Sequence, residues 1–276
     1  MTQSNLASTL PELTDHLEQA EEVVVLTGAG ISVASGIEPF RKSADAIWER
    51  DVTELATRRF FNASPLESWL WYLNRFDTLT DKQPNPAHDA LTELESWCEA
   101  HHKRFTLVTQ NIDTLHRKAG SQRCVEIHGR ADAYRCTQIG CKNAAPRGVI
   151  PADHFDLAAL KANPSDEGLP RCPECGSLVR PHILWFDERY DEHEGYQFER
   201  ALRAFDTADV IICIGTSFSV GITELALGQA HQRFVDFWVI DPSIDRFVAP
   251  FVSKLERPAE EALPDLMSRL KKRDES

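Results

Sequence analysis

The amino-acid sequence predicts an α/β protein that is built on a parallel sheet. Four short apolar runs have the continuous hydrophobicity of strands buried on both faces, at residues 23–26, 105–108, 210–214 and 237–240. Apolar residues recur at helical spacing between several of these runs, for example at residues 87–100 and 222–232. Strands that alternate with helices are typical of a parallel sheet, and 276 residues suffice for one or two domains.

The predicted elements follow one another along the chain with two interruptions. Residues 10–20 have apolar positions three and four apart, so we expect a helix directly before the first strand. Residues 42–83 have a mostly helical pattern, whereas residues 129–180 are irregular, contain cysteine and are rich in proline and glycine. We expect these two excursions to form a second, smaller domain, with a ligand site in the cleft between the domains.

The composition limits the possible classes of function. The chain has 30 basic and 43 acidic residues, so its formal net charge is −13 at pH 7 and its surface repels nucleic acid and anionic lipid. The one basic cluster, at residues 271–273, is interpreted as the solvated end of a helix. Neither a membrane-spanning apolar run nor a secretory signal is found, which predicts a cytoplasmic protein with no membrane partner.

A glycine-rich turn, TGAGIS at residues 27–32, follows the first predicted strand. Glycines at this place allow backbone N–H groups to approach a phosphate, with the dipole of the next helix behind them. The turn lacks the third glycine of the usual dinucleotide fingerprint, and we find no acidic residue at the end of a second strand. By itself, therefore, the pattern fits a phosphate site and an ordinary tight turn equally well.

Five motifs together are more specific than this turn. They are GAGISVASGIEPFR at residues 28–41, TQNIDTLH at 109–116, EIHG at 126–129, LVRPHILWFDE at 178–188 and GTS at 215–217. In this order, they resemble the signatures of the sirtuins, the NAD-dependent protein-lysine deacylases. The resemblance implies a Rossmann-like parallel-sheet domain that binds NAD, formed by residues 1–41, 86–128 and 181–276. The inserted smaller domain would combine a helical module, residues 42–85, with a zinc module, residues 129–180.

The resemblance also implies which residues bind NAD, the co-substrate. They are Gly28, Ala29, Gly30, Ser32, Phe40, Arg41, Gln110, Asn111, Ile112, Asp113, Gly215, Thr216, Ser217, Asp241 and Ala259. The chain departs from the family pattern at Glu38-Pro39, where the family usually has Pro-x, and at Asp241, where it usually has Asn. Asp241 can accept hydrogen bonds from ribose hydroxyls but cannot donate one, so we expect an effect on cofactor affinity more than on cofactor identity.

His128 is implied as the general base. A lone histidine is usually a surface or core residue, and His128 is singled out by its motif. Its ordinary pKa, near ~6.5, suits proton removal at neutral pH. Asn111 and Asp113 would position the ribose and nicotinamide, while Phe40 and Arg41 would exclude water from the reactive carbon. Asp113 could instead cap a helix at residues 114–119.

The reaction implied by the resemblance has two steps. The acyl oxygen of an acyl-lysine attacks C1′ of the nicotinamide ribose, and nicotinamide leaves. His128 then deprotonates a ribose hydroxyl, which attacks the resulting imidate. The products are free lysine, nicotinamide and O-acyl-ADP-ribose. The expected partners are acyl-lysine proteins or peptides, with no nucleic acid, and we expect the chain to act as a monomer.

Four of the seven cysteines form two close pairs, Cys136-x4-Cys141 and Cys172-x2-Cys175. Four thiolates in two short loops suit a closed tetrahedral Zn²⁺ site, and the sirtuins carry such a site here. Free thiols are the alternative, although zinc would stabilise a module whose own core is small. The remaining cysteines are interpreted as buried apolar side chains: Cys98, Cys124 and Cys213.

The choice of acyl group depends on a predicted amphipathic helix at residues 64–79. Tyr72 and Arg75 are three positions apart and share a face, where they could be an ordinary surface pair. However, the sirtuins that remove acidic acyl groups have Tyr-x-x-Arg here and a small residue upstream, which matches Ala56. Arg can bind a carboxylate with two hydrogen bonds, so we expect succinyl- or malonyl-lysine preference with some acetyl removal. The substrate backbone would lie beside Phe186.

Three other classes of function are compatible with parts of this pattern: other NAD-consuming enzymes, non-catalytic modules and dehydrogenases. An NAD glycohydrolase or an ADP-ribosyltransferase would use the same nicotinamide pocket with another acceptor. A non-catalytic module that senses NAD or binds zinc would not need Asn111, Asp113 and His128 together. A hydride-transferring dehydrogenase fits worst, because nothing in the chain resembles its acid–base residues.

Overall fold

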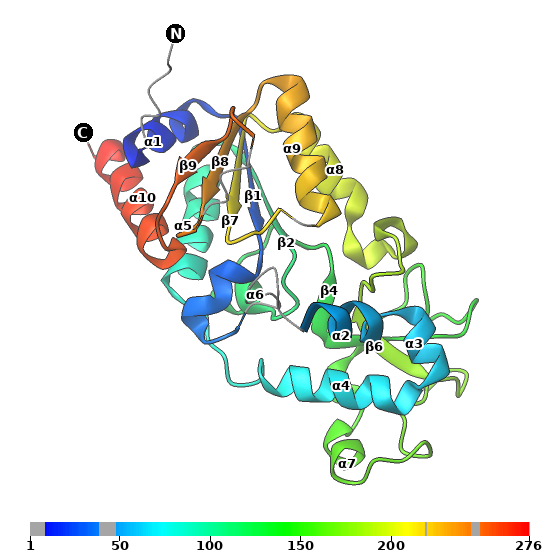
Figure 1. Ribbon diagram of the computed structural model, residues 1–276. Coiled ribbons are helices and arrows are strands. Elements are labelled where there is room, and N and C mark those ends of the chain that lie inside the picture. Colours follow the sequence, from blue (N-terminus) through cyan, green and yellow to red (C-terminus); the bar gives the residue numbers. More distant parts are fainter. Residues whose placement is uncertain (1–8, 39–47, 219, 244–248, 276) are drawn as a thin grey trace.

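The structure is a computed structural model and describes residues 9–38, 48–218, 220–243 and 249–275. Its largest element is a six-stranded parallel sheet with the order β3-β2-β1-β7-β8-β9 (Figure 1). The strands are β1 (Glu22–Thr27), β2 (Arg104–Thr109), β3 (Cys124–Glu126), β7 (Val210–Ile214), β8 (Asp236–Ile240) and β9 (Ser253–Leu255). The four apolar runs of the sequence correspond to β1, β2, β7 and β8, which confirms the predicted fold class.

Strand β1 lies between β2 and β7, where the order of the strands along the chain reverses. All residues of β1 and β7 are buried, as expected for strands that are covered on both faces. Thr27 pairs with Thr109 of β2 and with Ile214 of β7, so the three strands end at the same level. Three of the five motifs begin at or just beyond these strand ends. Ligands of open α/β sheets bind at this type of edge.

Helices cover both faces of this sheet (Figure 1). One face is packed by α1 (Leu10–Gln19), α5 (Pro86–Ala100) and α10 (Ala259–Asp274). The other is packed by α8 (Phe198–Thr207) and α9 (Gly221–Arg233). The helices predicted before the first strand and around residues 87–100 and 222–232 are therefore present. Among the described residues, no helix is both long and apolar enough to cross a membrane.

Local capping explains where the first-face helices begin. The Thr9 hydroxyl accepts a hydrogen bond from the Glu12 amide, and the Glu12 carboxylate accepts one from the Thr9 amide, so α1 starts with a capping box. The Asn85 side chain accepts from the Ala87 amide at the start of α5. Its own amide group donates to the Ile31 carbonyl at 2.8 Å, and this bond ties α5 to the loop after β1.

The basic cluster at residues 271–273 lies in the exposed last turn of α10. Lys271 pairs with Glu93 of α5 at 2.6 Å. Arg273 pairs with Asp15 and Glu18 of α1 at 2.6 and 2.7 Å. The cluster thus forms surface ion pairs with neighbouring helices, in agreement with its interpretation as a helix end.

A second, three-stranded antiparallel sheet has the order β5-β4-β6. Its strands are β4 (Gly129–Cys136), β5 (Ile150–Pro151) and β6 (Val179–Ile183). The helical segment lies beside it as α2 (Trp48–Leu55), α3 (Arg58–Ala63) and α4 (Pro65–Asp77), with α7 (Leu157–Ala162) below (Figure 1). One core cluster joins Trp69 and Tyr72 of α4 to Tyr134 and Val179 of this sheet. The division into domains stays a prediction.

Glu188, the last residue of the LVRPHILWFDE motif, has a completely buried side chain that meets three arginines. Arg135 and Arg58 lie 3.1 and 2.9 Å from its carboxylate, and Arg180 binds both of its oxygens. Burial alone would raise the pKa of Glu188, but the charges of Arg180 and Arg135 and the hydrogen bonds lower it to about 2. The carboxylate therefore joins β4, β6 and α3.

We predict that Glu188→Gln lowers the free energy of unfolding by about 3 kcal/mol or more, because it leaves buried guanidinium groups without their anion. The folded-state pKa is about 2 and the ordinary value is 4.5, so this contribution is complete above about pH 4.5 and is lost as the pH falls towards 2. Denaturation by urea at pH 7 measures the first effect. Glu192→Gln, at a partly exposed partner of Arg58, is the control and should cost about 1 kcal/mol or less.

Candidate active site

Two glycine loops meet through their backbones at the carboxyl edge of the six-stranded sheet. The Gly30 amide donates to the Gly215 carbonyl at 2.9 Å, and the Gly28 amide donates to the Ile214 carbonyl at 2.9 Å. A Cβ atom on Gly28 would lie 2.7 Å from the Gly215 oxygen, and one on Gly30 would lie 2.5 Å from the Gly215 Cα. Gly215 itself has a φ of +59°. The glycines are therefore required for the contact between the loops.

The turn after β1 continues as a 3-10 helix, η1 (Ala29–Ser35). Ser32 of η1 is buried, and its hydroxyl donates to the Asp113 carboxylate at 2.7 Å. The Asn111 side-chain amide donates to the Ser32 hydroxyl at 3.2 Å and to the Gly28 carbonyl at 3.0 Å. A chain of hydrogen bonds thus connects the first two motifs, from Asn111 through Ser32 to Asp113.

Asp113 also serves the start of the next helix, α6 (Leu115–Ala119). Its second carboxylate oxygen accepts a hydrogen bond from the Leu115 amide at 2.9 Å. The capping contact that the sequence left open is thus present, together with the Ser32 contact. Burial raises the pKa of Asp113, while the Leu115 and Ser32 hydrogen bonds act in the opposite direction. Its part in placing the nicotinamide stays a prediction.

Three buried polar side chains, Thr27, Thr109 and His116, form hydrogen bonds at the two ends of the second motif. The Thr27 hydroxyl donates to the Thr109 hydroxyl at 2.9 Å, and the His116 Nε2 atom lies 2.9 Å from the same Thr27 oxygen. Because Thr27 gives its proton to Thr109, His116 must donate from Nε2. Burial lowers the pKa of His116, so the ring is neutral. This contact holds α6 against the end of β1.

The His128 imidazole lies at the same edge, between β3 and β4. Its Nδ1 atom is 2.9 Å from the Gln110 carbonyl oxygen. A carbonyl can only accept, so Nδ1 carries the proton and Nε2 carries the lone pair. Burial lowers the pKa of His128 to about 4, although the Gln110 carbonyl acts in the opposite direction. The ring is therefore neutral at pH 7, with its basic nitrogen, Nε2, on a fixed side.

The other predicted NAD residues line the same edge or lie near it. The Gln110 side chain donates to the Thr216 hydroxyl at 3.2 Å, which links the second and fifth motifs. Asp241 follows β8, and its carboxylate accepts from the Ser243 amide at 2.8 Å. Burial raises the pKa of Asp241. Ala259 is the buried first residue of α10. Phe40 and Arg41 lie outside the described residues.

Three of the four predicted acyl-binding residues, Ala56, Tyr72 and Phe186, are connected through hydrogen bonds to Trp185 or its neighbour. Tyr72 is buried, and its hydroxyl accepts a hydrogen bond from the Trp185 indole at 2.7 Å, so the phenol proton points elsewhere. The Phe186 amide donates to the Ala56 carbonyl at 3.0 Å. Arg75 follows Tyr72 by three residues on α4, and burial lowers the pKa of its guanidinium to about 10, with Tyr72 acting in the opposite direction. Phe186 is 62% exposed.

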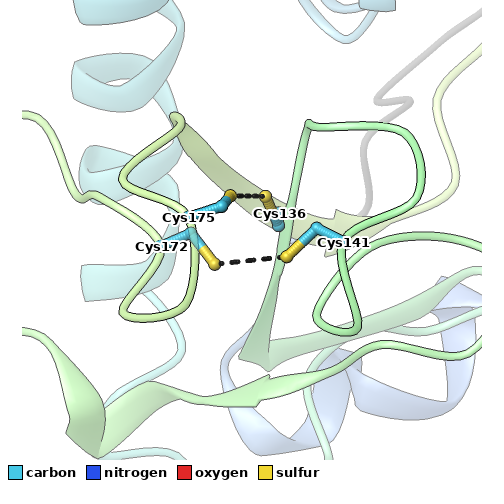
Figure 2. A group of neighbouring side chains, drawn as sticks. All are labelled: Cys136, Cys141, Cys172 and Cys175. Carbon is cyan, nitrogen blue, oxygen red and sulfur yellow. Dashed lines mark hydrogen bonds between the residues drawn. The ribbon is translucent and has the colours of Figure 1, made fainter.

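The four cysteines of the two pairs form one cluster (Figure 2). All four Sγ atoms lie within 4.8 Å of one another. The Cys136 and Cys175 sulfurs are 3.5 Å apart, and those of Cys141 and Cys172 are 3.7 Å apart. Tetrahedral zinc with Zn–S bonds of ~2.3 Å needs sulfurs about 3.8 Å apart, so the set fits zinc.

Hydrogen bonds to Cys172 and Cys175 lower the pKa values of these two thiols and so favour their thiolate forms. Burial acts to raise the pKa of Cys172, but the Asn143 side chain and the amides of Glu174 and Cys175 lower it to about 6. The remaining cysteines behave differently, since burial raises the pKa of Cys98 to about 12 and also raises those of Cys124 and Cys213. Their thiols stay protonated, and those of Cys98 and Cys213 are fully buried.

The family model described as the Sir2 family matches residues 28–221 of this chain. The chain belongs to the Sir2 family. The match begins at the first glycine of the turn after β1 and ends at the start of α9, so it spans all five motifs. The resemblance to the sirtuins in the sequence is thereby confirmed.

Curated relatives of this Sir2-family chain include enzymes from bacteria and animals. An NAD-dependent protein deacylase of Thermus thermophilus is 39% identical over 212 residues, which cover 76% of this chain and 75% of the relative. The mitochondrial NAD-dependent protein deacylase sirtuin-5 of Xenopus tropicalis is 32% identical over 276 residues, which cover 95% of this chain and 86% of the relative.

Solved Sir2 structures have the same fold. A complex of a Sir2 homologue with NAD is 32% identical to this chain and superposes with a TM-score of 0.77, over 97% of this chain and 96% of the other. A complex of Sir2 with a p53 peptide and NAD⁺ is 26% identical, with a TM-score of 0.73 over 95% and 98% of the two chains.

Sequence reasoning missed two aromatic residues of the site. Trp185 orients the Tyr72 hydroxyl, and Tyr190 contacts the His128 ring. Trp185 belongs to a quoted motif, so its place beside Phe186 was a usable signal. Tyr190 follows the motif by two residues and is 62 positions from His128, and no local pattern connects the two.

We predict that the purified protein contains one zinc ion per chain. Replacing Cys172 with serine removes a ligand from a closed four-sulfur site, so zinc content should fall nearly to zero and the Tm should drop. Metal analysis by mass spectrometry and thermal unfolding measure the two effects. Cys124→Ala, outside the cluster, is the control and should retain the zinc. Full zinc content in the Cys172→Ser protein would contradict the site.

Proposed function

We propose that this chain is an NAD-dependent protein deacylase that transfers the acyl group of an acyl-lysine to ADP-ribose. The observation that carries the proposal is the fixed His128 ring, whose basic Nε2 lies at the same sheet edge as the Asn111–Ser32–Asp113 chain of hydrogen bonds. Membership of the Sir2 family and the names of the relatives support it. One water is consumed, because it takes the place of the lysine nitrogen on the acyl carbon, and the products would be free lysine, nicotinamide and O-acyl-ADP-ribose.

When bound, NAD supplies the glycosidic bond that breaks to release nicotinamide. Asn111 and Asp113 would orient the ribose and nicotinamide, since both side chains are held in place by Ser32. His128 would take a proton from a ribose hydroxyl at Nε2, because Nδ1 already donates to Gln110. The two glycine loops are the segments that would approach the phosphates, because glycine lets a backbone come close to a ligand.

Within this function, we infer a preference for succinyl- or malonyl-lysine, with acetyl removal retained. A carboxylate at the end of the acyl chain would bind the half-buried Arg75 through charge-assisted hydrogen bonds. The Tyr72 hydroxyl would donate a further hydrogen bond to this carboxylate. Its oxygen accepts from the Trp185 indole, so its proton is left for another acceptor. Ala56 leaves room for a longer chain. The similarity to sirtuin-5 over 95% of this chain is in keeping with this inference.

Acyl-lysine segments of proteins are the proposed substrates. We propose that their backbone lies beside Phe186, whose large exposed ring is next to the Ala56 carbonyl contact. Action as a monomer, a cytoplasmic location and the lack of a nucleic-acid partner stay predictions. An NAD glycohydrolase or ADP-ribosyltransferase would have no use for the predicted acyl-binding residues, Ala56, Tyr72 and Arg75. Analysis of the reaction products separates these activities.

We predict that Arg75→Met lowers kcat/KM for a succinyl-lysine peptide by about tenfold or more, which equals ~1.4 kcal/mol of transition-state stabilisation. Activity towards the acetyl-lysine form of the same peptide should change little, because acetyl has no carboxylate. Steady-state assays with acetyl, malonyl and succinyl forms measure both values. Arg203→Met, on an exposed part of α8, is the matched control. Equal losses on all three peptides would refute the acyl assignment.

We predict that His128→Ala lowers the rate of O-acyl-ADP-ribose formation by about 100-fold or more, because the proton acceptor is lost. In the native protein, kcat/KM should fall only as the pH drops towards the His128 pKa of about 4, since the neutral ring is the active form. Mass spectrometry of the products measures the first effect. His231→Ala, at an exposed position, is the control. Free ADP-ribose as the main product of the native protein would favour a glycohydrolase.

A further inference from the structure

Tyr190 occupies the centre of a stack of three rings next to the site. It opens the short helix η3 (Tyr190–Glu192), two residues after Glu188. Its ring lies nearly parallel to that of His128, with centroids 5.8 Å apart and planes 20° apart. On its other side, the Phe198 ring of α8 is 5.1 Å away at 15°. The stack restricts rotation of the imidazole about its own axis.

The Tyr190 hydroxyl reaches the reactive side of the imidazole. Its oxygen is 3.4 Å from the His128 Nε2 atom. Since Nδ1 donates to Gln110, Nε2 is the acceptor and the phenol is the donor in this contact. The distance is long for an O–H···N bond, so an incoming hydroxyl can replace the phenol at small cost.

The same hydroxyl is held from the side of α9. The Ile222 amide hydrogen-bonds to Tyr190, which acts to lower the phenol pKa, although burial outweighs this and raises the pKa overall. Ile222 is the second residue of α9, where backbone N–H groups have no partner inside the helix. The phenol thus connects the imidazole to the start of the helix that follows the GTS loop.

The charged groups around this pair are paired with each other or exposed. Glu126 and Arg130, two residues before and after His128, form an ion pair at 4.0 Å, with side chains 17% and 26% exposed. Asp191 of η3, Glu199 of α8 and Glu224 of α9 all have exposed side chains. Exposed charges are screened by water and salt. The His128 pKa is set by burial and by the Gln110 carbonyl, so the phenol contact is the remaining polar influence on Nε2 that the described residues provide.

We propose that Tyr190 is a positioning residue for His128, which holds the imidazole plane by stacking and keeps Nε2 directed at the site through its hydroxyl. The phenol acts as a placeholder that a substrate hydroxyl displaces. Tyr190 therefore acts through His128 and not on the reacting atoms. The inference rests on the proposed role of His128 as the proton acceptor.

The test uses Tyr190→Phe and Tyr190→Leu in the full chain. The phenylalanine variant keeps the stack but removes the donor that stabilises the neutral imidazole, so the His128 pKa should rise by about half to one unit. NMR titration of His128 in the protein without NAD measures this shift. The acid side of the kcat/KM profile should move to higher pH by the same amount, with kcat at pH 8 almost unchanged.

The leucine variant removes both the hydroxyl and the stack. Its kcat should fall by about tenfold or more, because a rotated base loses alignment, while KM for NAD changes by less than about threefold. Tyr134→Phe is the matched control, since this buried tyrosine of β4 meets the Trp69 ring of α4 edge-on, with centroids 5.3 Å apart, and has no contact with His128 that the structure shows among the described residues. It should shift neither the His128 pKa nor the pH profile.

Different results separate the two proposals. An unchanged His128 pKa in Tyr190→Phe, with native kcat in Tyr190→Leu, would overturn the role of Tyr190. Native activity of His128→Ala would instead overturn the proposed base, even if the NMR shift in Tyr190→Phe were present. If Tyr190→Leu fails to fold, the titration of the phenylalanine variant decides the question alone.

Discussion

The contact between two glycine loops at the carboxyl edge of the large sheet is the constraint on which the site depends. Backbone atoms of Gly28 and Gly30 touch Gly215 so closely that any side chain would separate the loops. Strands β1 and β7 are neighbours in this sheet, although their sequences are almost 190 residues apart. The contact therefore brings distant motifs to one place through backbone atoms alone, because the amides of Gly28 and Gly30 donate to carbonyls of the segment Ile214–Gly215.

The buried Glu188 carboxylate is the second constraint, and it acts at the small antiparallel sheet. Glu188 draws Arg58, Arg135 and Arg180 together, and the peptide amide of Trp185 also donates to its carboxylate. Such a group is expensive to bury and is stable only when its partners are complete. The arrangement holds the segment before it, which carries Trp185 and Phe186, against α3 and α4. A cavity for an acyl chain needs walls that do not move when a carboxylate enters.

Two predictions from the sequence, the buried strands and the cluster of four cysteines, were confirmed for physical reasons. Apolar runs formed strands because a parallel sheet that is covered on both faces excludes water from its centre, so its strands are mostly hydrophobic. The two short cysteine spacings each hold a pair of sulfurs in one loop. The four Sγ atoms lie within 4.8 Å of one another. The glycine turn was ambiguous for an equally physical reason: its partner, Gly215, is in another part of the chain. Asp113 makes the capping contact with one carboxylate oxygen and accepts from Ser32 with the other, while its part in placing the nicotinamide stays a prediction.

Local sequence was sufficient for elements, motifs and family, because hydrophobic period, capping residues and ligand spacing act over a few positions. The sequence did not predict the contacts between side chains that lie far apart in the chain. The tautomer of His128 depends on the Gln110 carbonyl, and the ring beside it comes from Tyr190. The Tyr72 hydroxyl is turned by Trp185. Only the folded chain decides such contacts, since hydrogen-bond direction and burial are properties of neighbours in space and not of neighbours in sequence.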